Sequence, residues 1–218
     1  MNKDFDFAQK LVICGCGGHS KVVSEVAESI GFKEITYIDQ NNDEGYFLGR
    51  TKVKNIRENY SGYFFIAIGD NFLRENIYKQ FLQDHKSAKS VTLIHPSSVI
   101  SKRSEIKGGS VVMPLAVVNT DCNIGKGVII NTSSVVEHDA KLMDFSSLAP
   151  NSAVGGRAII GERTAISIGA NIKHGVKIGN DVVVGASSCV LNDLEPNIVS
   201  YGIPAKFIRN RKKGEKYL

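Results

Sequence analysis

The chain has 218 residues, of which 42% are hydrophobic and 22% are charged, proportions that are ordinary for a globular protein in water. Its net charge of +5 is modest, and the basic excess near the C-terminus has no interleaved aromatic residues, so we expect no nucleic-acid partner. No apolar run approaches the roughly 18 residues that a transmembrane helix requires, so we expect no membrane span.

The first residues, MNKDFDFAQ, place acidic side chains early, which is not the pattern of a secretion signal. We therefore expect a cytoplasmic protein. Its four cysteines show no spacing typical of a zinc site, so we expect reduced thiols and no metal centre.

Residues 10 to 90 show strands that alternate with helices. KLVICG, EITYID and GYFFIAIGD are predicted strands, and KVVSEVAESIGF is a predicted helix that closes at Gly31. For the second helix we expect Asn71 as the cap and Leu73, Ile77 and Phe81 as the apolar face. This alternation predicts a Rossmann-like domain with a parallel sheet over residues 1–92.

The turn between the first strand and helix reads GCGGHS. Gly15 permits a sharp turn, whereas Gly17 and Gly18 let backbone amides approach a ligand at a helix N-terminus, where phosphate is favoured. Ser20 stands where a dinucleotide-binding fingerprint has its third glycine. The turn suits a nucleotide phosphate, and a purely structural turn is the alternative.

Further polar residues are expected at the same edge of the sheet. Open α/β sheets bind ligands at the carboxyl ends of their strands, and two predicted strands end in polar residues there. These residues, with His19 from the glycine turn, are Asp39, Gln40, Gly69, Asp70 and Asn71. We predict that they form a nucleotide-binding cradle, and we expect structural roles for His85 and His95.

From Ile100 to Val190 an aliphatic residue occupies every sixth position, and a residue of small or modest size follows four places later in nearly every repeat. A period of six fits neither a helix nor an alternating strand. It is typical of a parallel β-helix, in which three short strands and their turns complete a coil of 18 residues. We predict such a domain over residues 93–218.

Because each coil has 18 residues, His138, Gly156 and His174 occupy the same position in three successive coils. We predict His138 as a general base, because imidazole titrates near neutrality. Asp139 follows it directly and can orient the ring. The amide of Gly156 can donate to an oxyanion, unless this glycine serves only the turn.

The segments CGCGGHSKVV, IAIGDN, NTSSVVEHD and YGIPAK together resemble the bacterial nucleotide-amino-sugar N-acetyltransferases, a hexapeptide-repeat family with sialic-acid O-acetyltransferases among its relatives. The resemblance implies a left-handed β-helix, a cytoplasmic homotrimer and acetyl-CoA as co-substrate. It further implies that the acceptor is a dTDP- or UDP-linked 4-amino-4,6-dideoxyhexose used for surface glycans.

The same resemblance implies roles for individual residues. Glu137 joins His138 and Asp139 in the catalytic group, and Asn131 contacts the substrate, although an asparagine can also serve only a turn. CoA is expected in a groove between subunits, with these contacts: Ser147, Gly156, His174, Ala186, Pro204 and Lys206.

Three other functions compete with N-acetylation. Transfer of the acetyl group to a hydroxyl would follow the sialic-acid relatives. A metal-dependent β-helix enzyme would need three converging histidines, and the β-helix offers only His138 and His174. An NAD-dependent enzyme would use the glycine turn, but Ser20 and the absence of a catalytic domain other than the solenoid argue against it.

Overall fold

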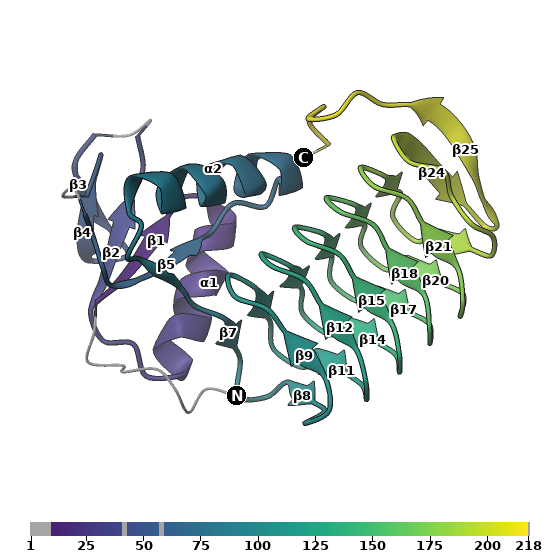
Figure 1. The fold of residues 1–218 in the computed structure, drawn as a ribbon, viewed down its shortest axis with the longest axis horizontal. Coiled ribbons are helices and arrows are strands. Elements are labelled where there is room, and N and C mark those ends of the chain that lie inside the picture. The colour runs from purple at the N-terminus through teal and green to yellow at the C-terminus, as the bar shows by residue number, and fades with distance from the viewer. Residues whose placement is uncertain (1–9, 41–42, 57–58, 218) are drawn as a thin grey trace.

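The structure is a computed structural model that describes residues 10–40, 43–56 and 59–217. Residues 1–9, on which the expectation about a secretion signal depends, lie outside this range. An α/β part is followed by a left-handed parallel β-helix, which confirms the predicted fold class (Figure 1). Within the described range, no helix combines the length and the apolar character needed to cross a membrane.

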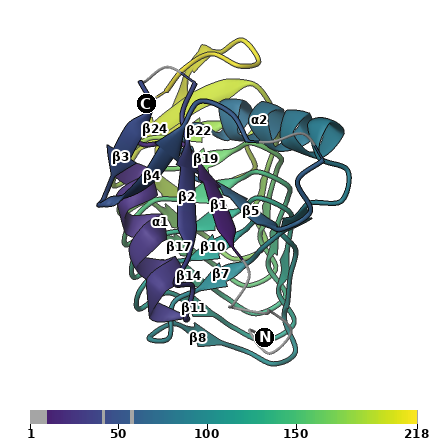
Figure 2. The ribbon, with the colours of Figure 1, turned by 90° about the vertical axis from the view of Figure 1, so that its left-hand side faces the viewer.

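The α/β part is built on one sheet with strand order β3-β4-β2-β1-β5-β6, parallel except for the β3–β4 pair. Helices α1 and α2 lie on opposite sides of this sheet (Figure 2). The elements in chain order are β1 (Leu11–Cys14), α1 (Gly18–Ser29), β2 (Ile35–Ile38), β3 (Gly45–Phe47), β4 (Arg50–Val53), β5 (Tyr63–Ile66), α2 (Asn71–Asp84) and β6 (Lys89–Ser90). Because β1 lies between β2 and β5, the carboxyl ends of all three strands meet at the expected ligand edge.

Helix α2 differs from its prediction in two respects. Its cap is Asp70, whose carboxylate accepts a hydrogen bond from the Leu73 amide at 2.8 Å, and not Asn71. Its buried side chains are largely polar, whereas Leu73 is 46% exposed. The predicted apolar face is therefore buried only in part: Phe81 stacks on Phe64 in a hydrophobic cluster and Ile77 packs against that cluster, whereas the contacts of Asn71, Arg74 and Glu75 are hydrogen bonds.

The β-helix has three faces, and each strand pairs in parallel with the strand 18 residues later, as in Val111 with Ile129. Face 1 contains β7 (Leu93–Ile94), β10 (Val111–Val112), β13 (Ile129–Ile130), β16 (Ser147–Leu148), β19 (Ala165–Ile166) and β22 (Val183–Val184). Face 2 contains β8 (Val99–Ile100), β11 (Val117–Val118), β14 (Val135–Val136), β17 (Ala153–Val154), β20 (Asn171–Ile172) and β23 (Cys189–Val190). Face 3 contains β9 (Glu105–Ile106), β12 (Asn123–Ile124), β15 (Lys141–Leu142), β18 (Ile159–Ile160) and β21 (Lys177–Ile178).

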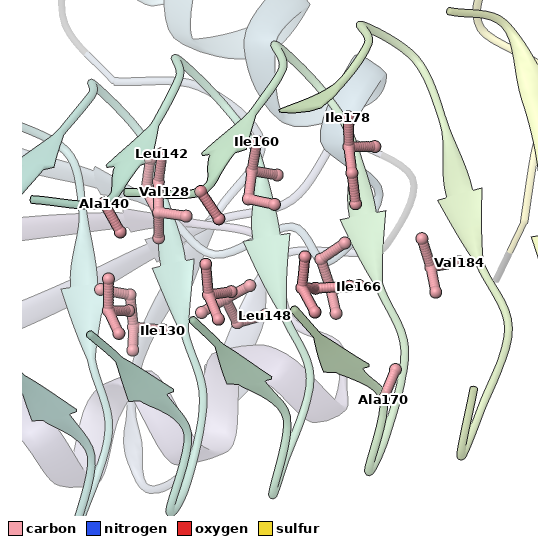
Figure 3. Packing of buried hydrophobic residues seen from close by; sticks show 14 of the residues in the cluster. Val128, Ile130, Ala140, Leu142, Leu148, Ile160, Ile166, Ala170, Ile178 and Val184 are labelled. Carbon is pink, nitrogen blue, oxygen red and sulfur yellow. The ribbon is translucent and has the colours of Figure 1, made fainter. Parts of the chain in front are cut away.

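The aliphatic residue of each hexad is the second residue of its strand and points into the prism. Figure 3 shows the resulting rows, with Leu142, Ile160 and Ile178 in one and Ile130 and Leu148 in another. Each such side chain contributes about 1.5–3 kcal/mol when fully buried. The small residues turn the chain at the corners, where hydroxyls also bond the backbone: Thr164 Oγ1 donates to the Gly179 carbonyl at 2.6 Å and accepts from the Val182 amide at 3.1 Å.

The two ends of the β-helix extend beyond the predicted repeat. Strand β7 already pairs with β10 on face 1, so the prism begins one strand before Ile100. At the other end, β24 (Ile198–Gly202) pairs with β22, and β25 (Ala205–Asn210) folds back on β24 as an antiparallel hairpin. Strand β6 belongs to the α/β sheet, and the division into domains at residues 92 and 93 stays a prediction.

Arg74 on α2 joins the two parts of the chain. It is 1% exposed, and its guanidinium donates to the Gly127 and Phe145 carbonyls of the β-helix and to the Ile68 and Gly69 carbonyls after β5, at 2.8 to 3.0 Å. Burial lowers the pKa of Arg74 to about 10. The loop after β5 is thereby fixed relative to the β-helix.

A buried ion-pair network continues this interface. Arg163 on the β-helix binds both carboxylate oxygens of Asp181, at 2.9 and 2.8 Å, and also Glu75 of α2 at 3.1 Å. The hydroxyl of Tyr217, near the C-terminus, accepts a hydrogen bond from the backbone amide of Asn71 at 3.2 Å. This end of the chain therefore lies beside the start of α2 (Figure 1). These contacts hold α2 along the prism edge between faces 3 and 1.

Candidate active site

The glycine turn forms an open site at the start of α1. Gly15 has a φ of +110°, and a Cβ there would lie 3.0 Å from the Ala67 carbonyl oxygen, so both conformation and space require glycine. Gly17 is the N-cap of α1 without a capping side chain, and nothing lies within 4 Å of a Cβ built on Gly17 or Gly18. The start of α1 therefore has free space beside its backbone, and a helix N-terminus with such space can bind a phosphate.

A pocket of about 630 Å³ begins at this turn and includes the ends of β1 and β2. It brings together four residues that the sequence predicted as ligand contacts: Gly15, Gly17, Asp39 and Gln40. The other lining residues were not predicted as ligand contacts: Cys14, Cys16, Ile38, Asn55, Ile56, Ile68, Leu73, Ile77, Gln80, Phe81, Asp84 and His85. Three of them, Leu73, Ile77 and Phe81, are the predicted apolar face of the second helix, and this face was the clearest signal in the sequence for the pocket wall.

His19 lies in the first turn of α1, and its Nε2 atom is buried without a hydrogen-bond partner among the described residues. Burial, with a smaller effect of the Arg74 charge, lowers the pKa of His19 to about 4. The ring is therefore neutral at pH 7 in the free protein. An anionic group bound at the helix N-terminus would give the ring a charge partner.

We expect His19 to make the free protein less stable in mild acid. The unfolded chain takes up a proton near pH 6.5 but the folded chain only near 4, so the free energy of unfolding falls as the pH decreases between these values. The loss is on the order of 2–3 kcal/mol. Denaturant titrations at pH 7.5 and 4.5 should show this loss for the wild type and a smaller one for His19→Gln; an equal loss in both proteins would contradict the assignment.

All four cysteines are free thiols, as expected. Burial raises the pKa of Cys14 to about 12, and burial together with the Asp39 charge raises that of Cys16 to about 11. Both thiols at the turn are therefore protonated at neutral pH, which disfavours a nucleophilic role.

Asn71 and Ser147 lie in the interface between the two parts of the chain. The side-chain amide of Asn71 donates to the Ser147 hydroxyl at 3.0 Å and to the Arg163 carbonyl at 3.1 Å, and Asn71 is 0% exposed. These two side chains join α2 to the β-helix, and neither belongs to the pocket lining. Gly69 and Asp70 are in the same loop, where the Gly69 carbonyl accepts from Arg74.

His138 and Asp139 form an exposed pair on the turn after β14. The ring Nδ1 lies 2.8 Å from an Asp139 carboxylate oxygen, and the His138 side chain is 52% exposed. When the proton is on Nδ1, this N–H donates a hydrogen bond to the carboxylate, and Nε2 keeps a free lone pair. The predicted orientation of the ring by its neighbour is therefore what the geometry provides.

Gly156 lies directly beneath the His138 ring on the next coil. A Cβ there would lie 2.7 Å from Nε2, so any side chain would displace the imidazole. Its φ is not in the left-handed range, which means that space and not turn geometry requires the glycine. Among the described residues its amide has no hydrogen-bond partner and is available as a donor.

The predicted site residues of the β-helix are divided between two edges of the prism. Glu137, His138 and His174 lie between faces 2 and 3, whereas Asn131 and Ala186 lie between faces 1 and 2. Asn131 also caps its own turn through the Thr132 amide at 2.8 Å. Helix α2 occupies the third edge, so one chain does not bring its pocket and its His138 to the same edge.

Face 2, which separates these two edges, is apolar on its outer side over its first four strands, β8 to β17, whereas the next strand presents the exposed Asn171. The outward residues Val99, Val117, Val135 and Ala153 are all at least partly exposed, and Val99 is 64% exposed. The outward residues of face 3 are instead mostly polar: Glu105, Asn123, Lys141 and Lys177. This difference suits burial of face 2 against another molecule.

The hairpin of β24 and β25 carries the last two predicted CoA contacts. Pro204 forms the turn after a cis peptide bond, and Lys206 is the second residue of β25, with its side chain exposed. Ile203 and Phe207 beside them are 79% and 58% exposed. Across the described ranges, no cluster of three His, Cys, Asp or Glu side chains is close enough to hold a metal ion.

Comparison with known proteins relates both parts of the chain to one family. Residues 10–81 match the family model described as the PglD N-terminal domain. The GDP-perosamine N-acetyltransferase of Escherichia coli O157:H7 is 29% identical over 124 residues, which cover 57% of this chain and 55% of that protein. The chain spans about half the length of the curated relatives that it matches.

Two solved structures are similar over almost the whole chain. PerB from Caulobacter crescentus, in complex with CoA and GDP-perosamine, is 35% identical with a TM-score of 0.85 and covers 92% of this chain and 97% of its own. The acetyltransferase domain of PglB from Neisseria gonorrhoeae FA1090, in complex with acetyl coenzyme A, is 30% identical with a TM-score of 0.85 and covers 92% and 99%.

Proposed function

Because the chain belongs to the hexapeptide-repeat acyltransferase family that includes PerB and the PglB acetyltransferase domain, we propose that it transfers an acetyl group from acetyl-CoA to the amino group of a nucleotide-linked sugar. The observation that carries this proposal is the pairing of a nucleotide-type pocket with the His138–Asp139 pair in one chain. The finer sequence prediction, a 4-amino-4,6-dideoxyhexose, is retained as part of it.

The reaction needs a group that removes a proton as the amine attacks the thioester carbonyl. In our proposal Nε2 of His138 accepts this proton, and the Asp139 carboxylate stabilises the imidazolium that forms. The amide of Gly156 donates to the oxyanion of the tetrahedral intermediate. When that intermediate collapses, the C–S bond breaks and the imidazolium returns its proton to the CoA thiolate.

We further propose that the site forms between two copies of the chain in a homotrimer. Burial of the apolar face 2 would bring the edge with Asn131 of one copy against the edge with His138 of the next. The nucleotide held by one α/β part would then present its sugar to the next copy's base.

CoA is assigned to the same groove. Gly156 and His174 would contribute from one edge and Ala186 from the other, while Pro204 and Lys206 would extend the site at the hairpin. The ammonium of Lys206 can pair with a CoA phosphate. Ser147 is not part of this assignment, because its hydroxyl is taken up by Asn71.

The test is an assay of thiol release from acetyl-CoA with GDP-, UDP- and dTDP-linked 4-amino-4,6-dideoxyhexoses and, as the hydroxyl acceptor, free sialic acid. Release with one or more of the amino sugars, with an N-acetylated product by mass spectrometry, is expected. Release with sialic acid alone would replace this function by O-acetylation, and no release with any acceptor would reject it.

A further inference from the structure

The pocket has a polar end that none of the predicted ligand contacts occupies. Gln80 and Asp84 lie one turn apart on α2, both line the pocket, and the Gln80 amide donates to a carboxylate oxygen of Asp84 at 2.8 Å. His85 follows, 8% exposed and also lining the pocket, and its Nδ1 atom has no partner in the described part of the chain. A buried nitrogen without a partner is uncommon in proteins and marks this end of the pocket as suited to a polar ligand.

The orientation of a bound nucleotide follows from the two ends of α2, and this step rests on the proposed function. The N-terminal end of α2 is bonded to the β-helix through Arg74 and Glu75, and the sugar amine must point toward that side to be acetylated. The phosphates belong at the start of α1. The base therefore extends in the opposite direction, along the pocket toward Asp84, which lies about 16 Å along the helix from Leu73.

The walls of this section suit a flat aromatic ring. Ile38 and Ile56 line one side, and Ile77 and Phe81 of α2 line another, so the section between phosphate site and polar end is apolar. A base can lie between such walls and present its edge to the polar end. Asp39 and Gln40, nearer the glycine turn, remain for the ribose.

We propose that the Gln80–Asp84 pair reads the base and selects guanine. A carboxylate accepts two parallel N–H groups, and guanine alone of the common bases offers a ring N–H and an amino group side by side on one edge. Uracil and thymine place their single N–H between two carbonyl oxygens, which a carboxylate repels. Adenine has a ring acceptor beside its amino group and is disfavoured for the same reason.

Gln80 orients the carboxylate of Asp84. Both side chains are exposed in the free protein, and the hydrogen bond from the Gln80 amide to one oxygen of Asp84 favours one orientation of the carboxylate. This assignment replaces the dTDP- or UDP-linked acceptor that the family resemblance implied. Asp84 and Gln80 are thus specificity-determining residues of the transferase.

The test measures binding of GDP, UDP and dTDP to the full chain by titration calorimetry without acetyl-CoA. The wild type should bind GDP at least about tenfold more tightly than either pyrimidine diphosphate. Asp84→Asn should weaken GDP binding about 10- to 100-fold and leave UDP binding unchanged. Glu25→Gln is the matched control, because it removes an exposed helical carboxylate, on α1, that lies outside the pocket lining, and it should change nothing.

Three outcomes would overturn the proposal: no preference of the wild type for GDP, an equal loss for all three ligands in Asp84→Asn, or loss of the preference in Asp39→Asn instead. Because the titration needs no acetyl transfer, it is separable from the proposed function. Guanine selectivity without turnover would reject only the transferase assignment, and turnover without guanine selectivity would reject only the reading by Asp84.

Discussion

Replacement of His138 by asparagine is expected to lower kcat by about 100- to 10,000-fold, because the attacking amine loses its proton acceptor. Asparagine keeps a polar group beside Asp139 but has no titratable nitrogen. Since the His138 side chain is half exposed, the free energy of unfolding should change little. Steady-state kinetics with saturating acetyl-CoA measures the effect.

His174→Asn is the matched control for this variant. His174 occupies the same edge two coils later and is also exposed, but its distance from His138 excludes it from the same proton transfer. We expect a change of less than about tenfold, mainly in the KM for acetyl-CoA. If both variants lost activity equally, or if His138→Asn retained it, His138 would not be the base.

Gly17→Asp should lower kcat/KM for the nucleotide sugar by on the order of 100-fold, because it places a carboxylate where the phosphates are expected to bind. The side chain has room, since nothing lies within 4 Å of a Cβ at this position. Gly17 is also the N-cap of α1, and aspartate is a better cap than glycine by a few tenths of a kcal/mol. The variant should therefore be at least as stable as the wild type while losing most of its activity.

Gly17→Asn separates charge from bulk in that experiment. Asparagine has nearly the same shape and caps equally well, so its loss of kcat/KM should be several-fold at most. Thermal unfolding of both variants measures whether the new N-cap side chain keeps α1 at least as stable as in the wild type. Equal losses in the two would mean that space and not charge matters, and unchanged activity in both would remove the phosphate from this turn.

The β-helix was predictable because its requirements are local and repeat in the sequence. Each coil needs an inward aliphatic residue and a small corner residue, and Ile100 to Val190 meet this at every strand. The pattern even continues backward to Ile94, which pairs on face 1 and which we had left outside the repeat. The relation of His138 to Gly156 followed from the same 18-residue spacing.

The buried face of α2 was not predictable in this way. Arg74, Glu75 and Asn71 are polar, and their partners are carbonyl groups and side chains more than 50 residues away in the chain. Apolar periodicity instead selected Leu73, Ile77 and Phe81, which line the pocket, and of these only Phe81 is also buried in the core. A helix can pack through polar residues and present its apolar stripe to a ligand, or it can pack through the apolar stripe and present polar residues to solvent. Both helices have the same hydropathy pattern.

The most direct test of the shared site mixes two inactive chains. His138→Asn and Gly17→Asp, co-expressed with different tags and purified as mixed oligomers, each carry one intact half of the proposed site. If one copy's pocket works with the next copy's His138, each mixed trimer holds one intact site of three and restores about a third of the wild-type rate. If base and pocket act within a single chain, the mixture stays as inactive as its parents, and the proposed site between copies is wrong.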